Sequence, residues 1–201
     1  MKRGDERRRT TSPRSPKLLV EFERLLRTRA VPLGFIAASD AERISERHIS
    51  DSLRAVRCLR RDDQILMDIG TGAGLPGIPV AIAEPQRQVY LVEPVAKRAA
   101  FLELAVERLG LENVDVLVQR AEDVSKQVDV CFARAVAPPV KAWELTAPLL
   151  RPGGRLLYFA GRSWSATIED DLRARGAAFH LCDHGGFAWQ GPIVIMARTS
   201  Q

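Results

Sequence analysis

The sequence contains few cysteines and few aromatic residues: three of its 201 residues are cysteine and 6% are aromatic. The cysteines, Cys58, Cys131 and Cys182, are odd in number and lie in apolar or unpatterned surroundings. We therefore expect reduced and mostly packed thiols, because a disulfide framework uses paired cysteines. His180, Cys182 and His184 match no standard ligand spacing, so the sequence predicts no metal site.

Long apolar runs are also missing. No stretch approaches the roughly 20 apolar residues that cross a membrane, and the charged N-terminus has no apolar stretch behind it. The sequence predicts neither a transmembrane helix nor a signal peptide, and we expect a cytoplasmic protein without a membrane partner. A chain of 201 residues with 46% hydrophobic content suffices for one α/β domain with a modest extension. We expect a monomer.

Positive charge is concentrated at the N-terminus. The formal net charge is +5, and residues 1–17 are basic, rich in Ser and Pro and nearly devoid of apolar side chains. Such a tail is expected to be disordered when free. A flexible basic arm can contact phosphates and release counterions, which indicates RNA or DNA as a partner. The alternative is a solvated tail without a role.

Strand and helix patterns alternate through most of the chain. Residues 18–29 and 41–59 have apolar side chains at helical spacing and predict helices of an N-terminal extension, 18–62. The rest, 63–201, predicts an α/β fold with a mostly parallel seven-stranded sheet, whose last two strands form an antiparallel hairpin at the sheet edge. Strands are predicted at 64–69, 88–92, 113–118, 128–132, 154–159, 177–182 and 192–198, and helices at 76–84, 95–109, 139–150 and 165–175.

A glycine-rich loop at residues 68–77 joins an apolar strand to a helix and is the most informative segment. Without Cβ atoms, its backbone N–H groups can approach a nucleotide-like ligand closely. The loop satisfies G-x-G-x-x-G, and Glu93 follows at about the distance of a ribose-binding acid, which fits NAD. Asp68, however, would repel a pyrophosphate and attract the ammonium and sulfonium of S-adenosylmethionine (SAM). We therefore favour SAM.

Two further features favour SAM over NAD. Gly70, Gly72 and Gly74 follow an acidic residue at the spacing typical of class I methyltransferases. The predicted terminal hairpin also distinguishes a methyltransferase sheet from a NAD-binding sheet. The sequence thus predicts a class I, Rossmann-like methyltransferase domain over 63–201.

Several motifs together share their spacing with one family. They are RHISDSL at 47–53, DIGTGAGLPGIP at 68–79, Glu93 with KRAAFL at 97–102, and LGLENV at 109–114 with RAE at 120–122 and ARAVA at 133–137. They resemble motifs of the small-subunit (16S) ribosomal RNA guanine-N7 methyltransferases, also called glucose-inhibited division protein B. Two stretches depart from that family: 29–36 lacks W-N-x-x-x-N-L-T, and Ala160-Gly161 replaces Lys-Gly. Both flank the substrate side.

The resemblance implies SAM as the cofactor and 16S rRNA or the small ribosomal subunit as the partner. Arg134 is also the predicted catalytic residue, because its planar fork suits a carboxylate or a guanine oxygen; a surface salt bridge is the alternative. The candidate RNA-binding residues are Arg47, His48, Lys97 and Arg98. The candidate cofactor-binding residues are Asp68, Gly70, Gly72, Gly74, Leu75, Glu93, Ala121, Glu122 and Arg134.

For three residues of the motif RHISDSL at 47–53, a functional role and a structural role are equally supported by the sequence. Asp51 and Ser52 are either functional or an ordinary helix-surface pair, and His48 is either functional or a packing histidine.

Guanine N7 has a free lone pair, so its methylation needs no general base and catalysis can rest on orientation. Residues 137–140 read Ala-Pro-Pro-Val and lack the Asn or Asp and the aromatic residue that grip an exocyclic amine. No Pro-Cys nucleophile for cytosine C5 is present.

Two other classes of protein remain open: a small-molecule SAM enzyme with an incidental basic tail, and a degenerate SAM-binding protein that associates with the ribosome.

Overall fold

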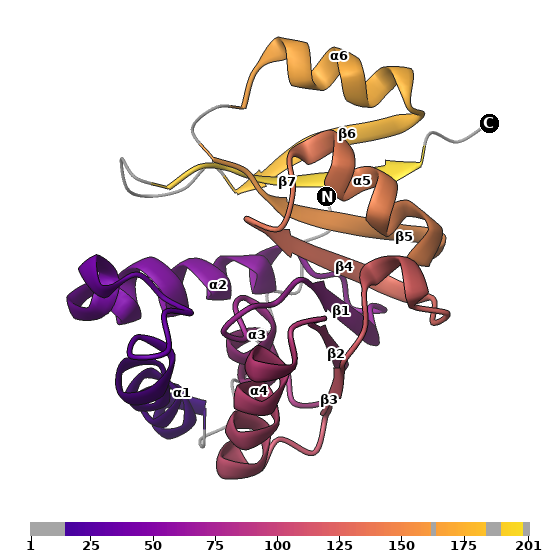
Figure 1. Ribbon diagram of the computed structural model, residues 1–201. Coiled ribbons are helices and arrows are strands. Elements are labelled where there is room, and N and C mark those ends of the chain that lie inside the picture. The colour runs from indigo at the N-terminus through magenta and orange to yellow at the C-terminus, as the bar shows by residue number, and fades with distance from the viewer. Residues whose placement is uncertain (1–14, 162–163, 184–189, 199–201) are drawn as a thin grey trace, which may run out of the picture.

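The computed structural model describes residues 15–161, 164–183 and 190–198. A seven-stranded sheet in the order β3-β2-β1-β4-β5-β7-β6 forms its centre (Figure 1). The strands are β1 Ile65–Ile69, β2 Gln88–Val92, β3 Val114–Leu117, β4 Val128–Arg134, β5 Leu150–Phe159, β6 Ala177–Asp183 and β7 Ile193–Arg198.

Strands β1 to β5 run parallel, and β7 runs antiparallel to both β5 and β6. This confirms the predicted mostly parallel sheet with an antiparallel hairpin, in which β6 is the edge strand. β1 lies between β2 and β4, so the strand order reverses there, and ligands of open α/β sheets bind beyond the carboxyl ends of strands at such a point.

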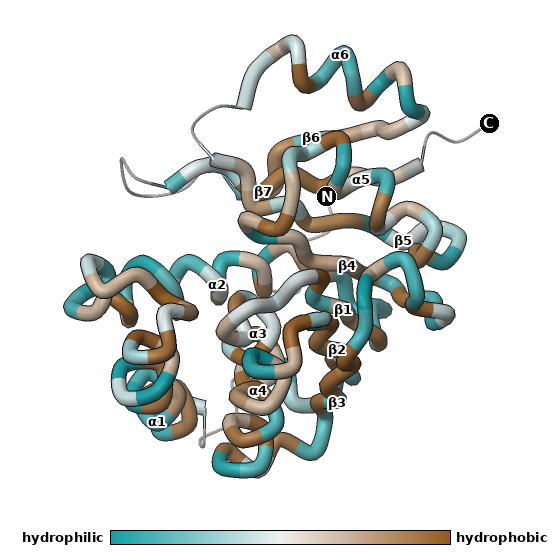
Figure 2. The backbone as a smooth tube through the Cα atoms, in the orientation of Figure 1, coloured by the Kyte–Doolittle hydropathy of each residue, from teal (hydrophilic) through white to brown (hydrophobic). Residues whose placement is uncertain are grey.

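Helices cover both faces of the sheet. β4 shows how one strand serves two cores: Val130 and Phe132 belong to one buried cluster, whereas Cys131 and Ala133 belong to the other. The central strands accordingly consist mostly of hydrophobic residues (Figure 2). Among the described residues, no helix is long and apolar enough to cross a membrane. One side carries α1 Ser15–Leu25, α2 Asp51–Leu53, α3 Gly77–Ala83 and α4 Ala96–Leu109; the other carries α5 Pro139–Thr146 and α6 Ala166–Ala174 (Figure 1).

The predicted helix at 139–150 is too long. α5 ends at Thr146, a 3-10 turn covers Ala147–Leu149, and β5 already begins at Leu150. Pro148 explains the early end, because proline lacks the N–H that a continuing α-helix requires.

The predicted helix at 41–59 is a series of short pieces. The hydroxyl of Ser52 donates to the backbone carbonyl of His48 at 2.6 Å, and such side-chain bonds compete with regular helix bonds. The predicted helix at 18–29 is likewise divided, since α1 continues as a π-helical turn, Leu26–Ala30. The pieces around α2 are 3-10 at Ala38–Arg43, π-helical at Ser45–Ser50 and 3-10 at Arg54–Cys58.

The N-terminal helices share a core with the sheet. Phe22, Leu26 and Ile44 are fully buried in the same cluster as β1 and α4 residues. The ordered chain includes Ser15, which is buried and whose hydroxyl donates to the carbonyl of Ile82 at 3.0 Å. The tail was predicted to be disordered over residues 1–17; this was wrong for residues 15–17, which form the start of α1, and residues 1–14 lie outside the described residues.

The prediction of three reduced cysteines was wrong for two of them. Cys58 and Cys182 form a disulfide with Cα atoms 5.9 Å apart, while Cys131 is a buried free thiol. The two partners are separated by 124 residues in sequence, so neither their local surroundings nor their number revealed the pairing. They meet because the segment Arg54–Cys58 packs beside β6.

We expect loss of this disulfide to lower the free energy of unfolding. The cross-link closes a loop spanning 124 residues in the unfolded chain, and such a loop corresponds to about 2–5 kcal/mol. Denaturant unfolding of the oxidised protein, with and without dithiothreitol, measures the effect. The double variant C58S/C182S is the control and should not respond to the reductant. An unchanged unfolding midpoint of the reduced wild type would contradict the expectation.

Candidate functional site: a glycine loop and an arginine-lined cavity

The glycine loop leaves β1 at the carboxyl-terminal end of the sheet. The backbone N–H groups of Gly70 and Thr71 donate to the carbonyl of Val92 at 2.9 and 3.2 Å, which attaches the loop to the end of β2. Gly70 and Gly72 have φ angles of +63° and +61°, a region that favours glycine. A Cβ on Gly70 would lie 2.4 Å from Val136, but one on Gly72 would meet nothing closer than 4.0 Å. The loop is therefore open above Gly72, where a ligand can approach the backbone.

The Asp68 carboxylate lies beneath this loop and is 1% exposed. Its Oδ2 accepts hydrogen bonds from the Thr71 hydroxyl at 2.6 Å and the Gly77 N–H at 2.8 Å. Its Oδ1 is buried without a hydrogen-bond partner among the described residues. Burial is the main cause that raises the pKa of Asp68 to about 6; the charge of Glu93 contributes to this rise, and the hydrogen bonds from Thr71 and Gly77 oppose it. A buried acceptor without a partner is costly, so Asp68 fits a cationic ligand such as the ammonium of SAM.

Glu93 follows β2 and is almost completely buried. Its Oε2 accepts a hydrogen bond from the Gly72 N–H and its Oε1 one from the Val95 N–H, both at 3.0 Å. The carboxylate thus fixes the glycine loop, a role that the sequence analysis did not foresee. Each oxygen keeps a second lone pair, so the residue also fits the ribose hydroxyls for which it was predicted.

The other predicted cofactor residues lie at the same end of the sheet. Leu75 is buried in the loop, and a Cβ on Gly74 would lie 2.5 Å from the Ile78 side chain. Ala121 and Glu122 begin a 3-10 turn after β3, where Ala121 is buried and Glu122 is exposed. All of them therefore occupy the ends of β1 and β3 as the sequence predicted, and their ligand contacts remain predictions.

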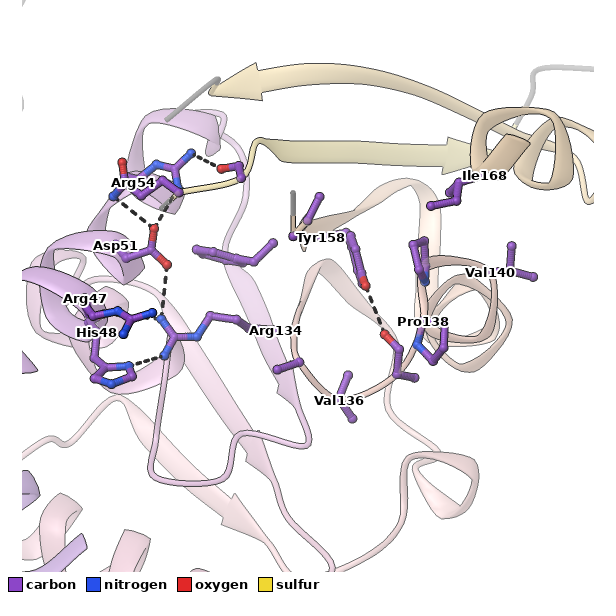
Figure 3. A pocket seen from close by; sticks show the side chains of 18 of the residues that line it. Arg47, His48, Asp51, Arg54, Arg134, Val136, Pro138, Val140, Tyr158 and Ile168 are labelled. Atoms are coloured by element: carbon purple, nitrogen blue, oxygen red, sulfur yellow. Dashed lines mark hydrogen bonds and ion pairs between the residues drawn. The ribbon is translucent and has the colours of Figure 1, made fainter. Parts of the chain in front are cut away.

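Arg134 is the last residue of β4. Its Nη2 lies 3.0 Å from His48 Nδ1, and its Nη1 lies 3.4 Å from Asp51 Oδ2 (Figure 3). The same Nη1 lies 3.4 Å from the Ser52 hydroxyl. Burial lowers the pKa of Arg134, and the charge of Asp51 opposes that shift. The sequence analysis singled out Arg134 as a candidate residue but missed these partners. The only local signal was the motif at 47–53 that contains all three of them.

The hydrogen bond from Arg134 determines the tautomer of His48. A guanidinium has donors only, so Nδ1 must accept and the proton must reside on Nε2, which lies 3.2 Å from Asp40 Oδ2. Burial, together with the charge of Arg134, lowers the pKa of His48, so the ring is neutral near pH 7. Asp40, which the sequence analysis did not single out, accepts a hydrogen bond from Arg47 at 2.6 Å.

A cavity of about 1160 Å³ adjoins Arg134. The polar groups of Arg47, His48 and Asp51 lie on one side of it, and apolar side chains including Pro138 and Tyr158 lie on the other (Figure 3). Ala160 and Gly161, which stand where the family has Lys-Gly, also line the cavity.

Two candidate RNA-binding residues are not among the residues that line this cavity. Lys97 and Arg98 lie in the first turn of α4, where Lys97 is exposed and the Arg98 guanidinium lies 5.9 Å from the Phe35 ring centre.

The sheet order, the glycine loop after β1 and the acid after β2 define the fold of a class I SAM-dependent methyltransferase. Solved structures with this fold include M. jannaschii TYW2 in complex with AdoMet, with a TM-score of 0.56, 17% identity and coverage of 78% of this chain and 77% of that one. A SAM dependent methyltransferase from Aquifex aeolicus gives a TM-score of 0.55, 18% identity and coverage of 76% and 92%.

Sequence relatives identify the family more closely. The family GidB, rRNA small subunit methyltransferase G, matches residues 16–180. The ribosomal RNA small subunit methyltransferase G of Clavibacter sepedonicus is 40% identical over 156 residues, covering 77% of this chain and 73% of the relative. That of Corynebacterium efficiens is 37% identical over 177 residues, covering 82% and 76%. The chain belongs to the rRNA small subunit methyltransferase G family, which confirms the predicted family and SAM as its methyl donor.

We expect the affinity for SAM to increase as the pH rises from about 5 to about 7. Asp68, with a pKa raised to about 6, must ionise before it attracts an ammonium group. The variant D68N should lose this pH dependence and bind SAM about 10- to 100-fold more weakly at pH 7, as for loss of one charged hydrogen bond. Calorimetric titration at several pH values is the measurement, with the exposed-site variant D62N as the matched control. If the wild-type affinity for SAM did not change across this pH range, Asp68 would not be the residue that binds the ammonium group.

Proposed function

We propose that this protein transfers a methyl group from SAM to N7 of a guanine in 16S ribosomal RNA. The observation that carries the proposal is the adjacency of two sites. Ile69 pairs with Ala133 in the sheet, so the loop after β1 and Arg134 at the end of β4 are neighbours. The donor side has the Asp68 oxygen that lacks a hydrogen-bond partner within the described part of the chain, and the acceptor side has the cavity beside Arg134. The curated relatives are named for methylation of small-subunit rRNA.

SAM, when bound, supplies an electrophilic methyl group on its sulfonium. We assign Asp68 to its ammonium, Glu93 to its ribose hydroxyls, and Ala121 and Glu122 to its adenine. The small side chain of Ala121 leaves room for a flat ring. The remaining proposed contacts come from the loop residues Gly70, Gly72, Gly74 and Leu75.

The acceptor side has the groups expected for guanine N7, whose free lone pair needs no general base. His48 is a poor base here, because its Nδ1 accepts from Arg134 and its Nε2 faces Asp40. Arg134 uses only some of its five N–H donors in hydrogen bonds to the protein. Other donors can therefore bind guanine O6, which leaves the N7 lone pair free to attack the methyl group. The residues of this site therefore orient the base and do not move a proton.

The RNA partner is supported by the shape and charge of the same region. Tyr158 and Pro138 offer apolar surfaces beside a base, and the Tyr158 hydroxyl is held by the carbonyl of Ala137 at 3.1 Å. We assign Arg47 and the exposed Lys97 to phosphates, with Arg98 next to Lys97. We also propose that the complete substrate is the small ribosomal subunit, and that the protein is a monomer located in the cytoplasm.

The decisive experiment is single-turnover methyl transfer from labelled SAM to 16S rRNA and to small ribosomal subunits, with the methyl located by nucleoside mass spectrometry. We expect N7-methylguanosine. In R134A the rate should fall about 10- to 100-fold, because one charge-assisted hydrogen bond is lost in a shielded site. R134K should fall nearly as far, since an ammonium cannot reproduce the planar fork.

Thermal melts of both Arg134 variants control for folding. Transfer to a small molecule alone would favour a small-molecule enzyme, and SAM binding without transfer would favour a degenerate binding protein. Wild-type rates in R134A and R134K would leave Arg134 with a structural role only.

We also expect that deleting residues 1–14 weakens rRNA binding without changing SAM affinity. This segment has six basic and two acidic side chains, and phosphate contacts by such residues make binding depend steeply on salt. Ending the deletion before Ser15 keeps its hydrogen bond to Ile82. Binding of the truncated and full chains to 16S rRNA over a salt series should give a smaller slope for the truncated chain. Equal slopes would identify the segment as a passive tail.

A further inference from the structure

The carboxylate of Asp51 joins three distant parts of the chain beside the cavity. Its side chain is 13% exposed. Its Oδ1 accepts hydrogen bonds from Arg54 Nη1 at 2.7 Å and from Gln190 Nε2 at 3.2 Å, and its Oδ2 accepts one from Arg134 Nη1 at 3.4 Å. These donors come from the N-terminal helices, from the segment before β7 and from β4. Asp51 is thus the common acceptor of three side chains.

Arg54 fixes the position from which Asp51 acts. Its Nε and Nη2 donate to Asp183 Oδ1 at 2.9 and 2.7 Å, and its Nη2 donates to the carbonyl of Gly191 at 2.9 Å. Four residues later, Cys58 is bonded to Cys182. The helical segment that carries Asp51 is therefore tied to the hairpin by an ion pair and by a covalent bond.

Arg134 depends on Asp51 for part of its orientation. Arg134 is the last residue of β4, and its guanidinium lies at the end of a long, flexible side chain. The strand ends there, since the next residue, Ala135, has a φ of +55°. His48 holds Nη2, and Asp51 with Ser52 holds Nη1. Asp51 is the one carboxylate that forms an ion pair with Arg134 among the described residues. Without its charge, Arg134 and Arg54 would lose the anion that they share.

We propose that Asp51 is a positioning residue for methyl transfer: it holds the Arg134 guanidinium against the cavity and so aligns the acceptor base. This proposal rests on the proposed function. Asp51 acts through Arg134, because its two oxygens already accept hydrogen bonds from three protein side chains. It was one of the residues for which the sequence left functional and structural readings at equal weight.

The test is single-turnover methylation of small ribosomal subunits by D51N, at saturating SAM and RNA. D51N keeps the shape of the side chain and removes its charge. We expect the rate to fall about tenfold or more, as for a weakened charged interaction, while the dissociation constant for SAM stays within about twofold. E46Q is the matched control: Glu46 lies five residues earlier, pairs with Arg43 at 3.1 Å and does not line the cavity. Its rate should equal that of the wild type.

A double-mutant comparison separates positioning from a general effect on folding. In an R134K background, where the guanidinium is absent, D51N should lower the rate by less than about twofold, because residues that act as a unit are not additive. A merely structural role would give the same loss in both backgrounds. D51E is a second variant if D51N does not fold, since it keeps the charge but displaces the carboxylate by one methylene. We expect it to melt like the wild type and to transfer the methyl about tenfold more slowly.

Equal losses in the two backgrounds, or rates of D51N and D51E within about twofold of the wild type, would overturn the proposal and leave the proposed function intact. Absence of methyl transfer by the wild type would remove the proposed function, and this proposal with it.

Discussion

The carboxylate of Asp51 lies between two arginine side chains, Arg54 and Arg134, which are 9% and 17% exposed, and much of the structure around the cavity follows from that constraint. A buried guanidinium is costly unless an anion and further acceptors satisfy it. Asp51 supplies the anion for both. The N-terminal helices must therefore stay docked against β4 and the hairpin, because undocking them would take Asp51 away from Arg134 and Arg54 away from Asp183. The disulfide from Cys58 to Cys182 reinforces the same contact.

Two carboxylates beneath the glycine loop have different environments despite similar burial. Both oxygens of Glu93 accept backbone N–H groups and shape the loop. Asp68 accepts the Thr71 hydroxyl and the Gly77 N–H on one oxygen, whereas its other oxygen has no partner among the residues that the structure describes, and burial raises its pKa. Hydrogen bonds to the charged form and desolvation act in opposite directions. Each carboxylate accepts two hydrogen bonds, so the difference lies in how they are distributed: both reach one oxygen of Asp68, whereas each oxygen of Glu93 accepts one.

Local patterns were sufficient to predict the sheet and the loop. β2 has the predicted limits 88–92, because alternating apolar residues and flanking turn residues determine a strand locally. The family motifs supplied the predicted cofactor residues, whose contacts with SAM stay predictions. The partners of Arg134 could not be predicted in this way, since His48 and Asp51 precede it by more than 80 positions. Likewise, only the folded chain brings Cys58 to Cys182.

These long-range contacts matter because the proposed chemistry leaves little else for the protein to do. When the acceptor is a free lone pair, no proton has to be removed, and rate depends on how well the reacting groups are oriented. An arginine side chain loses as much as about 2 kcal/mol of conformational entropy when it is ordered. His48 and Asp51 hold Arg134 in the folded protein, so this entropy is lost on folding and not again each time a base enters. A preordered arginine therefore suits an enzyme whose main contribution is alignment.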